Sequence, residues 1–248
     1  MKIGVINFQD RLEIFTWQGY KVPDPQEMQY YDKIYRAETD LIVRTLNRQG
    51  VRDIYIGREM DEIKGSGGLF LITPHRPVGI MQLCHVQTRD KKLIFRMEIN
   101  GMPCSEMSLC AAYAGAMGIP VLFVFGAEPY LQEAGRNLPG PFECVSSEIN
   151  PASLAELRSP FSRVGLELAQ KTEKALTHIG KTKPFQTGPV TVKFIFRYQG
   201  MMEKFCQFPF VKEQGDWLAI EATNAIEAWH LYRVASAGLD FWNLKISP

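Results

Sequence analysis

The chain has 248 residues, which is the length of one large α/β domain or of one domain with a smaller addition. Hydrophobic residues make up 46% and charged residues 22%, so the chain can bury a large core, which excludes wholesale disorder. The 28 Lys and Arg residues nearly balance the 27 Asp and Glu residues. This formal charge of +1 argues against a general nucleic-acid binder, which needs a basic surface for phosphates.

The sequence also bears on the compartment. No apolar run reaches the roughly 18 residues of a membrane span, and the amino terminus is predicted to form a strand rather than a signal peptide. The cysteines show no CxxC pair and no regular spacing: Cys84, Cys104, Cys110, Cys144 and Cys206. Reduced, buried thiols are the simplest interpretation, and we expect a cytoplasmic protein with neither a membrane nor a nucleic-acid partner.

The first part of the chain alternates predicted strands and helices. Apolar runs predict strands at 2–6, 51–56, 68–72, 80–86, 93–99 and 119–125. Residues 9–30, which include Pro23 and Pro25, are expected to form a loop. Helical spacing predicts a helix over 31–49 that ends at Gly50, and a helix of small residues over 103–117, against which another element can pack closely. The succession of strand, helix and strand at the start of the chain predicts a parallel sheet covered by helices.

The second part is predicted to be a smaller region of mixed composition. Ser159-Pro160 marks the start of a helix that runs to about His178. Strands are predicted at 190–198, 204–211 and 217–222, and a last helix over 224–237 begins at Asn224. We therefore predict an α/β fold with a mostly parallel central sheet flanked by helices over residues 1–150, which carries the active site, and a smaller α+β region over 151–248.

Few residues stand out as carriers of chemistry. The Gly65-Ser66-Gly67-Gly68 run precedes a strand and does not join a strand to a helix, so it is not a phosphate-binding loop. His75 and His85 follow predicted strand ends, where ligands bind in an open α/β sheet, and Glu106 lies in the first turn of the small-residue helix. Each residue alone is more commonly structural, but two imidazoles and a carboxylate together are ordinary zinc ligands.

Three stretches resemble a known family. They are residues 99–106 (Ile-Asn-Gly-Met-Pro-Cys-Ser-Glu) with the following helix and Gly118-Ile119-Pro120-Val121, residues 68–71 (Gly-Leu-Phe-Leu) with the two histidines behind them, and residues 222–228 (Ala-Thr-Asn-Ala-Ile-Glu-Ala). Together, and in the same order along the chain as in the family, they resemble the DppA-type D-aminopeptidases, zinc peptidases that form ring-like homo-oligomers. The resemblance implies that Glu106 and His75 bind metal and that His85 is the catalytic nucleophile or base.

The sequence departs from this family at the other metal ligands. The family's D-x-E pair at the end of the first strand corresponds to Asn7 and Gln9, or in a second register to Phe8 and Asp10. The family's histidine after the second strand corresponds to Met60. Amides and thioethers are poor ligands for a doubly charged metal, so a complete two-zinc site is not expected.

Glu59 and Asp10 offer replacement carboxylates. The resemblance then implies one zinc ion, held by His75, Glu106 and either of these two residues, more readily than two ions. A site without metal is the alternative.

The leading functional hypothesis is an amide or peptide hydrolase that acts on a small amino-acid-derived substrate, in a homo-oligomer, with His85 as base or nucleophile. The expected pocket residues are Asn7, Gln9, Glu59, Met60 and Cys104, under an aromatic loop with Phe15, Trp17, Tyr20, Tyr30 and Tyr31. One alternative is a metal-free enzyme that performs acyl transfer or a rearrangement. In it, His85 is assisted by the thiol of Cys84 or by that of Cys104, which lies near a predicted helix start. Another is a catalytically inactive homologue retained for binding or assembly.

Overall fold

The computed structural model describes residues 1–7, 25–57, 59–72, 94–126, 128–146, 163–196 and 199–244. The chain forms two compact units, each assembled from segments that are separate in the sequence. The first unit comprises Met1–His75, Val121–Leu131 and Pro139–Lys183, and the second comprises Arg76–Pro120, Gln132–Leu138 and Pro184–Pro248. These units interleave along the chain, whereas the sequence suggested one boundary near residue 150.

A five-stranded parallel sheet forms the centre of the first unit. Its strands are β1 (Lys2–Asn7), β2 (Asp53–Gly57), β3 (Ser66–Ile72), β6 (Val121–Gly126) and β7 (Glu143–Ser146), in the order β2-β1-β3-β6-β7. Every pairing in this sheet is parallel, which confirms the mostly parallel central sheet predicted from the sequence. The chain moves outward from β1 to β2 and returns to β3 on the other side, so the strand order reverses at β1 and β3.

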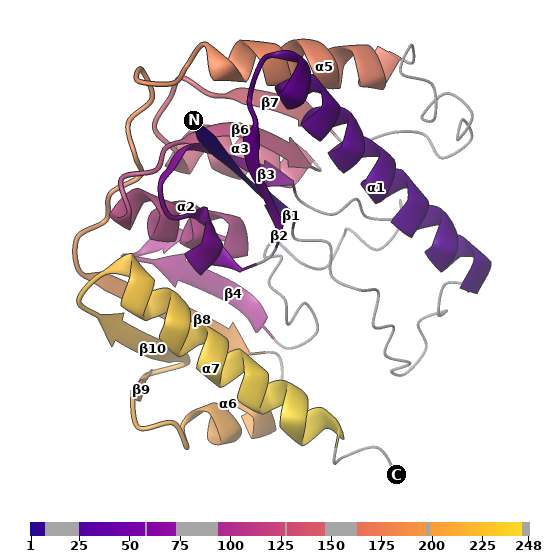
Figure 1. Cartoon of the computed structure of the whole chain (residues 1–248). Helices are drawn as coiled ribbons and strands as arrows, with labels where there is room; N and C mark the ends of the chain where they lie inside the picture. Colours follow the sequence, from indigo (N-terminus) through magenta and orange to yellow (C-terminus); the bar gives the residue numbers. More distant parts are fainter. Residues whose placement is uncertain are drawn as a thin grey trace. The chain divides into compact units, whose positions relative to one another are not determined.

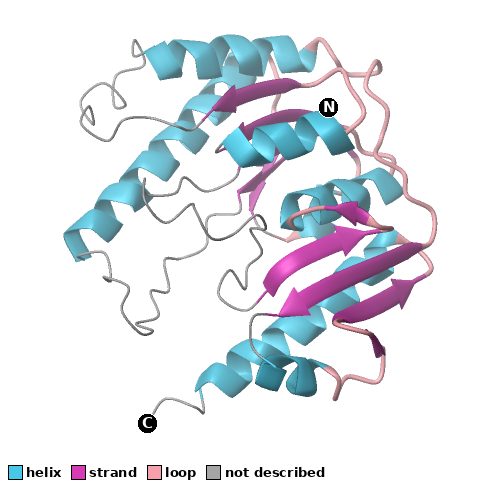
Figure 2. Ribbon diagram, turned by 180° about the vertical axis from the view of Figure 1, so that it is seen from behind, coloured by secondary structure: helices cyan, strands magenta, loops and turns pink. Residues whose placement is uncertain are grey.

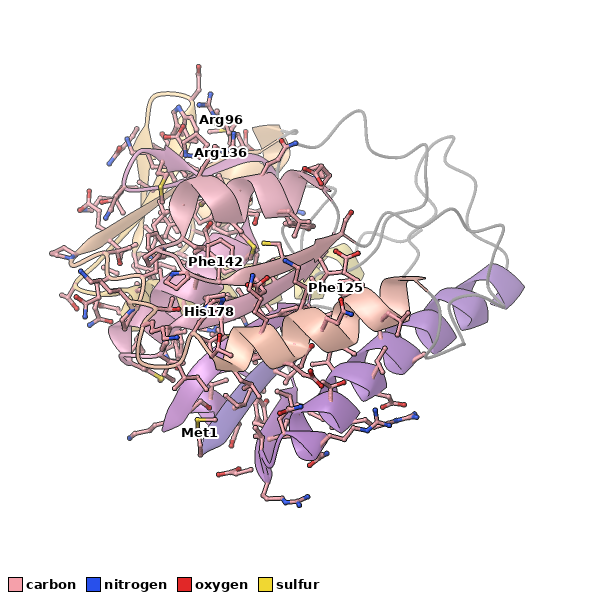
Figure 3. The ribbon with its side chains drawn as sticks, turned by 90° about the horizontal axis from the view of Figure 1, so that it is seen from above. Met1, Arg96, Phe125, Arg136, Phe142 and His178 are labelled. Atoms are coloured by element: carbon pink, nitrogen blue, oxygen red, sulfur yellow. The ribbon has the colours of Figure 1, made fainter. Side chains whose placement is uncertain are left out.

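Two helices cover one face of this sheet: α1 (Pro25–Arg48) and α5 (Arg163–Leu176), which lie side by side (Figures 1 and 3). Apolar side chains form a core between the sheet and these helices: Ile3, Val5, Phe70, Ile72, Phe123, Phe125 and Val145 from the strands meet Ile42, Leu46, Leu168 and Ala175 from the helices. The rings of Phe70 and Phe123 stack with their centroids 5.1 Å apart. This packing confirms the helix-flanked α/β architecture.

A short crossover joins β2 to β3 over the other face of β1. It contains the 3-10 helix η1 (Met60–Ile63), whose Met60 and Ile63 are buried. The Ile63 Cγ2 atom would lie 3.0 Å from a Cβ at position 4, so Gly4 lets the crossover approach the strand closely. Lys2 Nζ donates hydrogen bonds to the carbonyl oxygens of Glu62 (2.6 Å) and Lys64 (3.2 Å), which hold the far end of the crossover.

The second unit is built on a five-stranded antiparallel sheet. Its strands are β4 (Ile94–Ile99), β5 (Met102–Pro103), β8 (Val190–Phe196), β9 (Val211–Gln214) and β10 (Trp217–Ala222), in the order β5-β4-β8-β10-β9. The helices α6 (Gln199–Phe205) and α7 (Ala225–Leu244) pack against β8 and β10, and Figure 2 shows α7 behind the strands. The helix α2 (Glu106–Ala116) packs on α7, where Tyr113 contacts the rings of Trp229 and His230.

Most predicted elements are confirmed, with ends that differ by a few residues. The predicted turn at Asn100-Gly101 joins β4 to β5 with φ of 52° and 79°, values that Asn and Gly tolerate best. The predicted cap of the last helix is also present: Asn224 Oδ1 accepts from the backbone N–H groups of Ile226 and Glu227, each at 3.0 Å. The predicted strand at 80–86 lies outside the described residues.

Two predictions were wrong. Residues 25–30 belong to α1 and not to a loop, because a proline fits the first turn of a helix, where its missing N–H group is not needed. Residues 204–210 end α6 and form turns, and do not form a strand. The aromatic residues in this segment give it the sequence pattern of a strand. In the structure, Phe205 packs on Phe194 (5.9 Å between centroids) and Phe208 packs on Phe205 (6.0 Å), so tertiary packing determines the secondary structure here.

No helix in the described part of the chain is both long enough and apolar enough to span a bilayer.

The helix α3 (Glu128–Asn137) starts in the first unit and ends in the second.

A cluster of cationic side chains around one buried carboxylate joins β7 to α5 in the first unit. Glu143 is only 4% exposed and lies 2.6 Å from Lys171 Nζ, 2.8 Å from Lys174 Nζ and 2.9 Å from His178 Nε2. His178 lies just beyond the carboxyl end of α5 (Figure 3). Burial raises the pKa of Glu143, but the hydrogen bonds from Lys171, Lys174 and His178 outweigh it and lower the pKa from 4.5 to about 2.

Glu143→Gln is expected to lower the free energy of unfolding at pH 7 by about 2 kcal/mol, because a carboxylate with charged partners is lost. The folded-state pKa is depressed, so this stabilisation is complete above about pH 5 and disappears as the pH falls from 4.5 to 2. Urea denaturation of both proteins between pH 2 and 7 measures the difference. The same change at the exposed Glu173 of α5 is the control, and a gap between wild type and Glu143→Gln that does not narrow in acid would contradict this account.

Candidate functional site

The carboxyl ends of β1 and β3 lie side by side in the first unit. Asn7, the last residue of β1, is in register with Ile72, the last residue of β3. Because the strand order reverses here, this edge is the topological switch point, where open α/β sheets bind ligands. In the sequence, Gln9 and Asp10 come two and three residues after the end of β1, and His75 comes three residues after the end of β3. All three lie outside the described residues.

The neighbouring strand β2 ends at the same edge and leads to Glu59 and Met60. Glu59 is exposed, and its backbone N–H donates to the hydroxyl oxygen of Tyr55 at 3.1 Å. Met60 is only 1% exposed and belongs to the core under the crossover. The position that corresponds to the family's histidine therefore holds a buried apolar side chain, whereas its neighbour Glu59 keeps a carboxylate at the surface.

Glu106 is the first residue of α2 in the second unit, and its side chain is half-buried. The preceding residue, Ser105, has an extended backbone and caps the helix, because its Oγ accepts from the N–H of Met107 at 3.2 Å. The chain reaches this helix from the β4–β5 turn, where Asn100 Oδ1 accepts from the N–H of Thr191 at 2.8 Å. The cap of Ser105 and the hydrogen bond of Asn100 thus fix where α2 begins, and with it the backbone position of Glu106.

A second carboxylate, Glu133 of α3, lies under the start of α2. It is 6% exposed, and one of its oxygens, Oε1, accepts three hydrogen bonds: from Ser105 N (2.9 Å), Ser105 Oγ (2.9 Å) and Ser108 Oγ (2.5 Å). Burial raises the pKa of Glu133, against the lowering effect of these hydrogen bonds. The sequence analysis missed this residue, because nothing near Glu133 in the sequence points to serines 25 and 28 positions away.

Cys104 precedes the cap and is buried. Burial raises the pKa of its thiol well above the usual value, and the charges of Glu133 and Glu98 raise it further. The helix start therefore does not depress this pKa, and a thiol held protonated is a poor nucleophile. The other described cysteines, Cys110, Cys144 and Cys206, are also free, and Cys84 lies outside the described residues.

Among the residues that the structure describes, no three His, Cys, Asp or Glu side chains form a group that could hold a metal ion. Of the positions implied as metal ligands or catalytic residues, Glu106 is described, whereas His75, His85 and Asp10 are not. The structure thus places Asn7, Glu59 and Met60 along one sheet edge in the first unit, and Cys104 and Glu106 at the start of α2 in the second. His85 and Gln9 also remain predictions.

The family model of the D-aminopeptidases matches residues 58–234, which is more than half of the chain. The chain belongs to the D-aminopeptidase family. Among solved structures, it is similar to the Zn-dependent D-aminopeptidase DppA from Bacillus subtilis, which is described as a self-compartmentalizing protease. The TM-score is 0.70 at 16% sequence identity, and the match covers 96% of this chain and 97% of that one. No curated protein matches the sequence significantly.

The structural similarity confirms the α/β fold over almost the whole length of both chains. The family match confirms the resemblance stated from the sequence. The matched region contains Glu59, Met60, His75, His85 and Glu106, but begins after Asn7, Gln9 and Asp10.

Proposed function

We propose that this chain is a peptide or amide hydrolase that acts on a small amino-acid-derived substrate. The observation that carries the proposal is the family match over residues 58–234, together with the placement of Glu106 on the fixed first turn of α2. The sequence resemblance assigns this carboxylate to the family's metal-binding glutamate. The DppA enzyme of similar fold is named as a D-aminopeptidase and a self-compartmentalizing protease. For this chain, these names support a substrate with a free amino group and a homo-oligomeric assembly. The reduced thiols fit a cytoplasmic protein.

The donor set fits one zinc ion better than two. Met60 is buried in the core and Asn7 carries a neutral amide, so two family positions offer no charged or imidazole donor. Glu106 and His75, with Asp10 or Glu59, supply the three protein ligands that a catalytic zinc site needs. A bound zinc ion would polarise the substrate carbonyl and lower the pKa of a bound water molecule to about 7.

The protein residues have separate roles in this proposal. Glu106 and His75 orient and hold the ion, while His85 takes or carries the proton that must leave the attacking water, or attacks the carbonyl itself. Asn7 and Glu59 lie at the carboxyl edge of the sheet. The oxygens of an amide and a carboxylate there can accept hydrogen bonds from the amino group and the peptide N–H group of a substrate.

Zinc titration and hydrolysis assays test the proposal on protein purified without chelators or a metal-affinity tag. We expect about one zinc ion per chain and hydrolysis of D- or L-aminoacyl amides or dipeptides. Glu106→Gln is expected to lower zinc affinity by more than about 100-fold, because a charged ligand becomes a neutral amide. Glu173→Gln, the same change on the exposed face of α5, should leave zinc affinity unchanged.

Each other result is informative. Two zinc ions per chain would contradict the one-ion site. Hydrolysis at an unchanged rate by zinc-free protein would favour the metal-free enzyme, an alternative that the burial of Met60 supports. Neither zinc binding nor hydrolysis would overturn the proposal and leave binding or assembly as the function.

A further inference from the structure

The strongest unexplained feature of the second unit is the buried carboxylate of Glu133. Buried carboxylates usually have a cationic partner, since burying an isolated charge is costly. The charge of Arg136, three residues further along α3, acts favourably on Glu133. The hydrogen bonds that the structure gives Glu133, however, come from polar groups around the start of α2, and all three converge on the single oxygen Oε1. A carboxylate in this place also interacts favourably with the positive end of the helix dipole.

The attachment points of Glu133 bracket Glu106. Ser105 lies immediately before Glu106 in the chain and offers both its backbone N–H and its hydroxyl group. Ser108 lies two residues after Glu106, and its hydroxyl bonds to the same oxygen. Because one hydrogen-bonded residue lies on each side of Glu106, the backbone of Glu106 has little freedom to rotate or shift.

A further hydrogen-bonding side chain from α3 reinforces this arrangement. Asn137 Nδ2 lies 3.2 Å from Ser108 Oγ and 3.2 Å from the carbonyl oxygen of Pro103, which precedes the cap. Glu133 and Asn137 are one helical turn apart, so the same face of α3 holds residues 103, 105 and 108 together. The first turn of α2 is therefore attached to the end of α3 and not only to its own helix.

We propose that Glu133 is a positioning residue that fixes the first turn of α2 and so orients the Glu106 carboxylate for zinc. This inference rests on the proposed function, in which Glu106 is a metal ligand. Groups that orient metal ligands from outside the coordination sphere change metal affinity by about 10- to 100-fold when they are removed. Glu133 does this through the backbone, by holding the residues on both sides of the ligand.

If Glu133 had only a structural role, its loss would act like the loss of any other buried carboxylate, and Glu143 offers a matched control for this case. Glu143 is a carboxylate of similar burial that also accepts several hydrogen bonds, but it joins β7 to α5 in the first unit. Its loss should destabilise the protein without any effect on α2. Comparing Glu133→Ala with Glu143→Ala therefore separates lost stability from lost positioning.

The experiment measures two quantities on the full chain: amide hydrogen exchange of residues 105–109, and zinc affinity by competition with a chromophoric chelator below the unfolding temperature. Glu133→Ala is expected to speed exchange in the first turn of α2 at least about tenfold and to weaken zinc binding about tenfold. Glu133→Gln should restore zinc affinity to within about threefold of wild type, because an amide oxygen can accept the same three hydrogen bonds. Glu143→Ala should change neither quantity.

Several results would overturn the inference. They are unchanged exchange in Glu133→Ala, faster exchange with unchanged zinc affinity, or equal losses of zinc affinity in Glu133→Ala and Glu143→Ala. In these cases the wild-type protein still binds zinc, and the proposed function stands. If the wild-type protein binds no zinc, the proposed metal site fails first, and the positioning role fails with it.

Discussion

Replacing His85 with alanine is expected to lower kcat/KM for amide hydrolysis by at least about 100-fold. A positioned base or acid contributes about 100- to 10,000-fold to such reactions, and a nucleophile contributes at least as much. The same loss is expected whether or not zinc takes part, because both enzyme hypotheses assign the proton transfer or the attack to His85. Steady-state kinetics on the aminoacyl amide that wild-type protein hydrolyses fastest measures the effect.

His230→Ala is the matched control for this experiment. His230 is an exposed histidine of α7 whose ring contacts the edge of Tyr113 at 5.9 Å between centroids, and no chemistry is assigned to it. Its removal should change kcat/KM by less than about twofold, as is usual for surface substitutions away from a site. Zinc content provides a second check: His85→Ala should retain its zinc, because a base or nucleophile is not a metal ligand. Full activity in His85→Ala would remove this residue from the site.

The parallel sheet could be predicted because its central strands are buried on both faces and therefore form continuous apolar runs in the sequence. Residues 119–125 are the clearest case, and β6 lies between β3 and β7 with every residue buried. The antiparallel sheet could be predicted only in pieces. Its strands β4 and β8 pair although about a hundred residues separate them, and no local pattern specifies such a partner.

The candidate site shows the same limit. Glu106 could be found because the Asn100-Gly101 turn and the small-residue helix frame it within a few residues. Glu133 could not, because its role depends on a contact between α2 and α3 that exists only in the folded chain. Met60 followed from the resemblance as a lost ligand, and the structure adds the physical reason: η1 folds its side chain into the core of the first unit.

Gly115→Ala is expected to be among the most destabilising single substitutions in this protein. A Cβ at position 115 would lie 2.0 Å from the backbone carbonyl oxygen of Phe185, and backbone cannot move aside as a flexible side chain can. Overpacking of this kind costs about 3 kcal/mol or more of unfolding free energy when the neighbour is fixed. The close approach that the small residues of α2 predicted is therefore a backbone contact with the segment after residue 184.

Gly135→Ala is the matched control, because Gly135 also lies inside a helix, α3, but is exposed and has nothing within 4 Å of the added carbon. Alanine there should raise the unfolding free energy by about 0.5–1 kcal/mol, since it removes the entropy cost of a helical glycine. Urea denaturation of the two variants should thus give shifts of opposite sign. If Gly115→Ala were as stable as wild type, α2 would have room to move away from residue 185, and a helix so free could not hold Glu106 in one place.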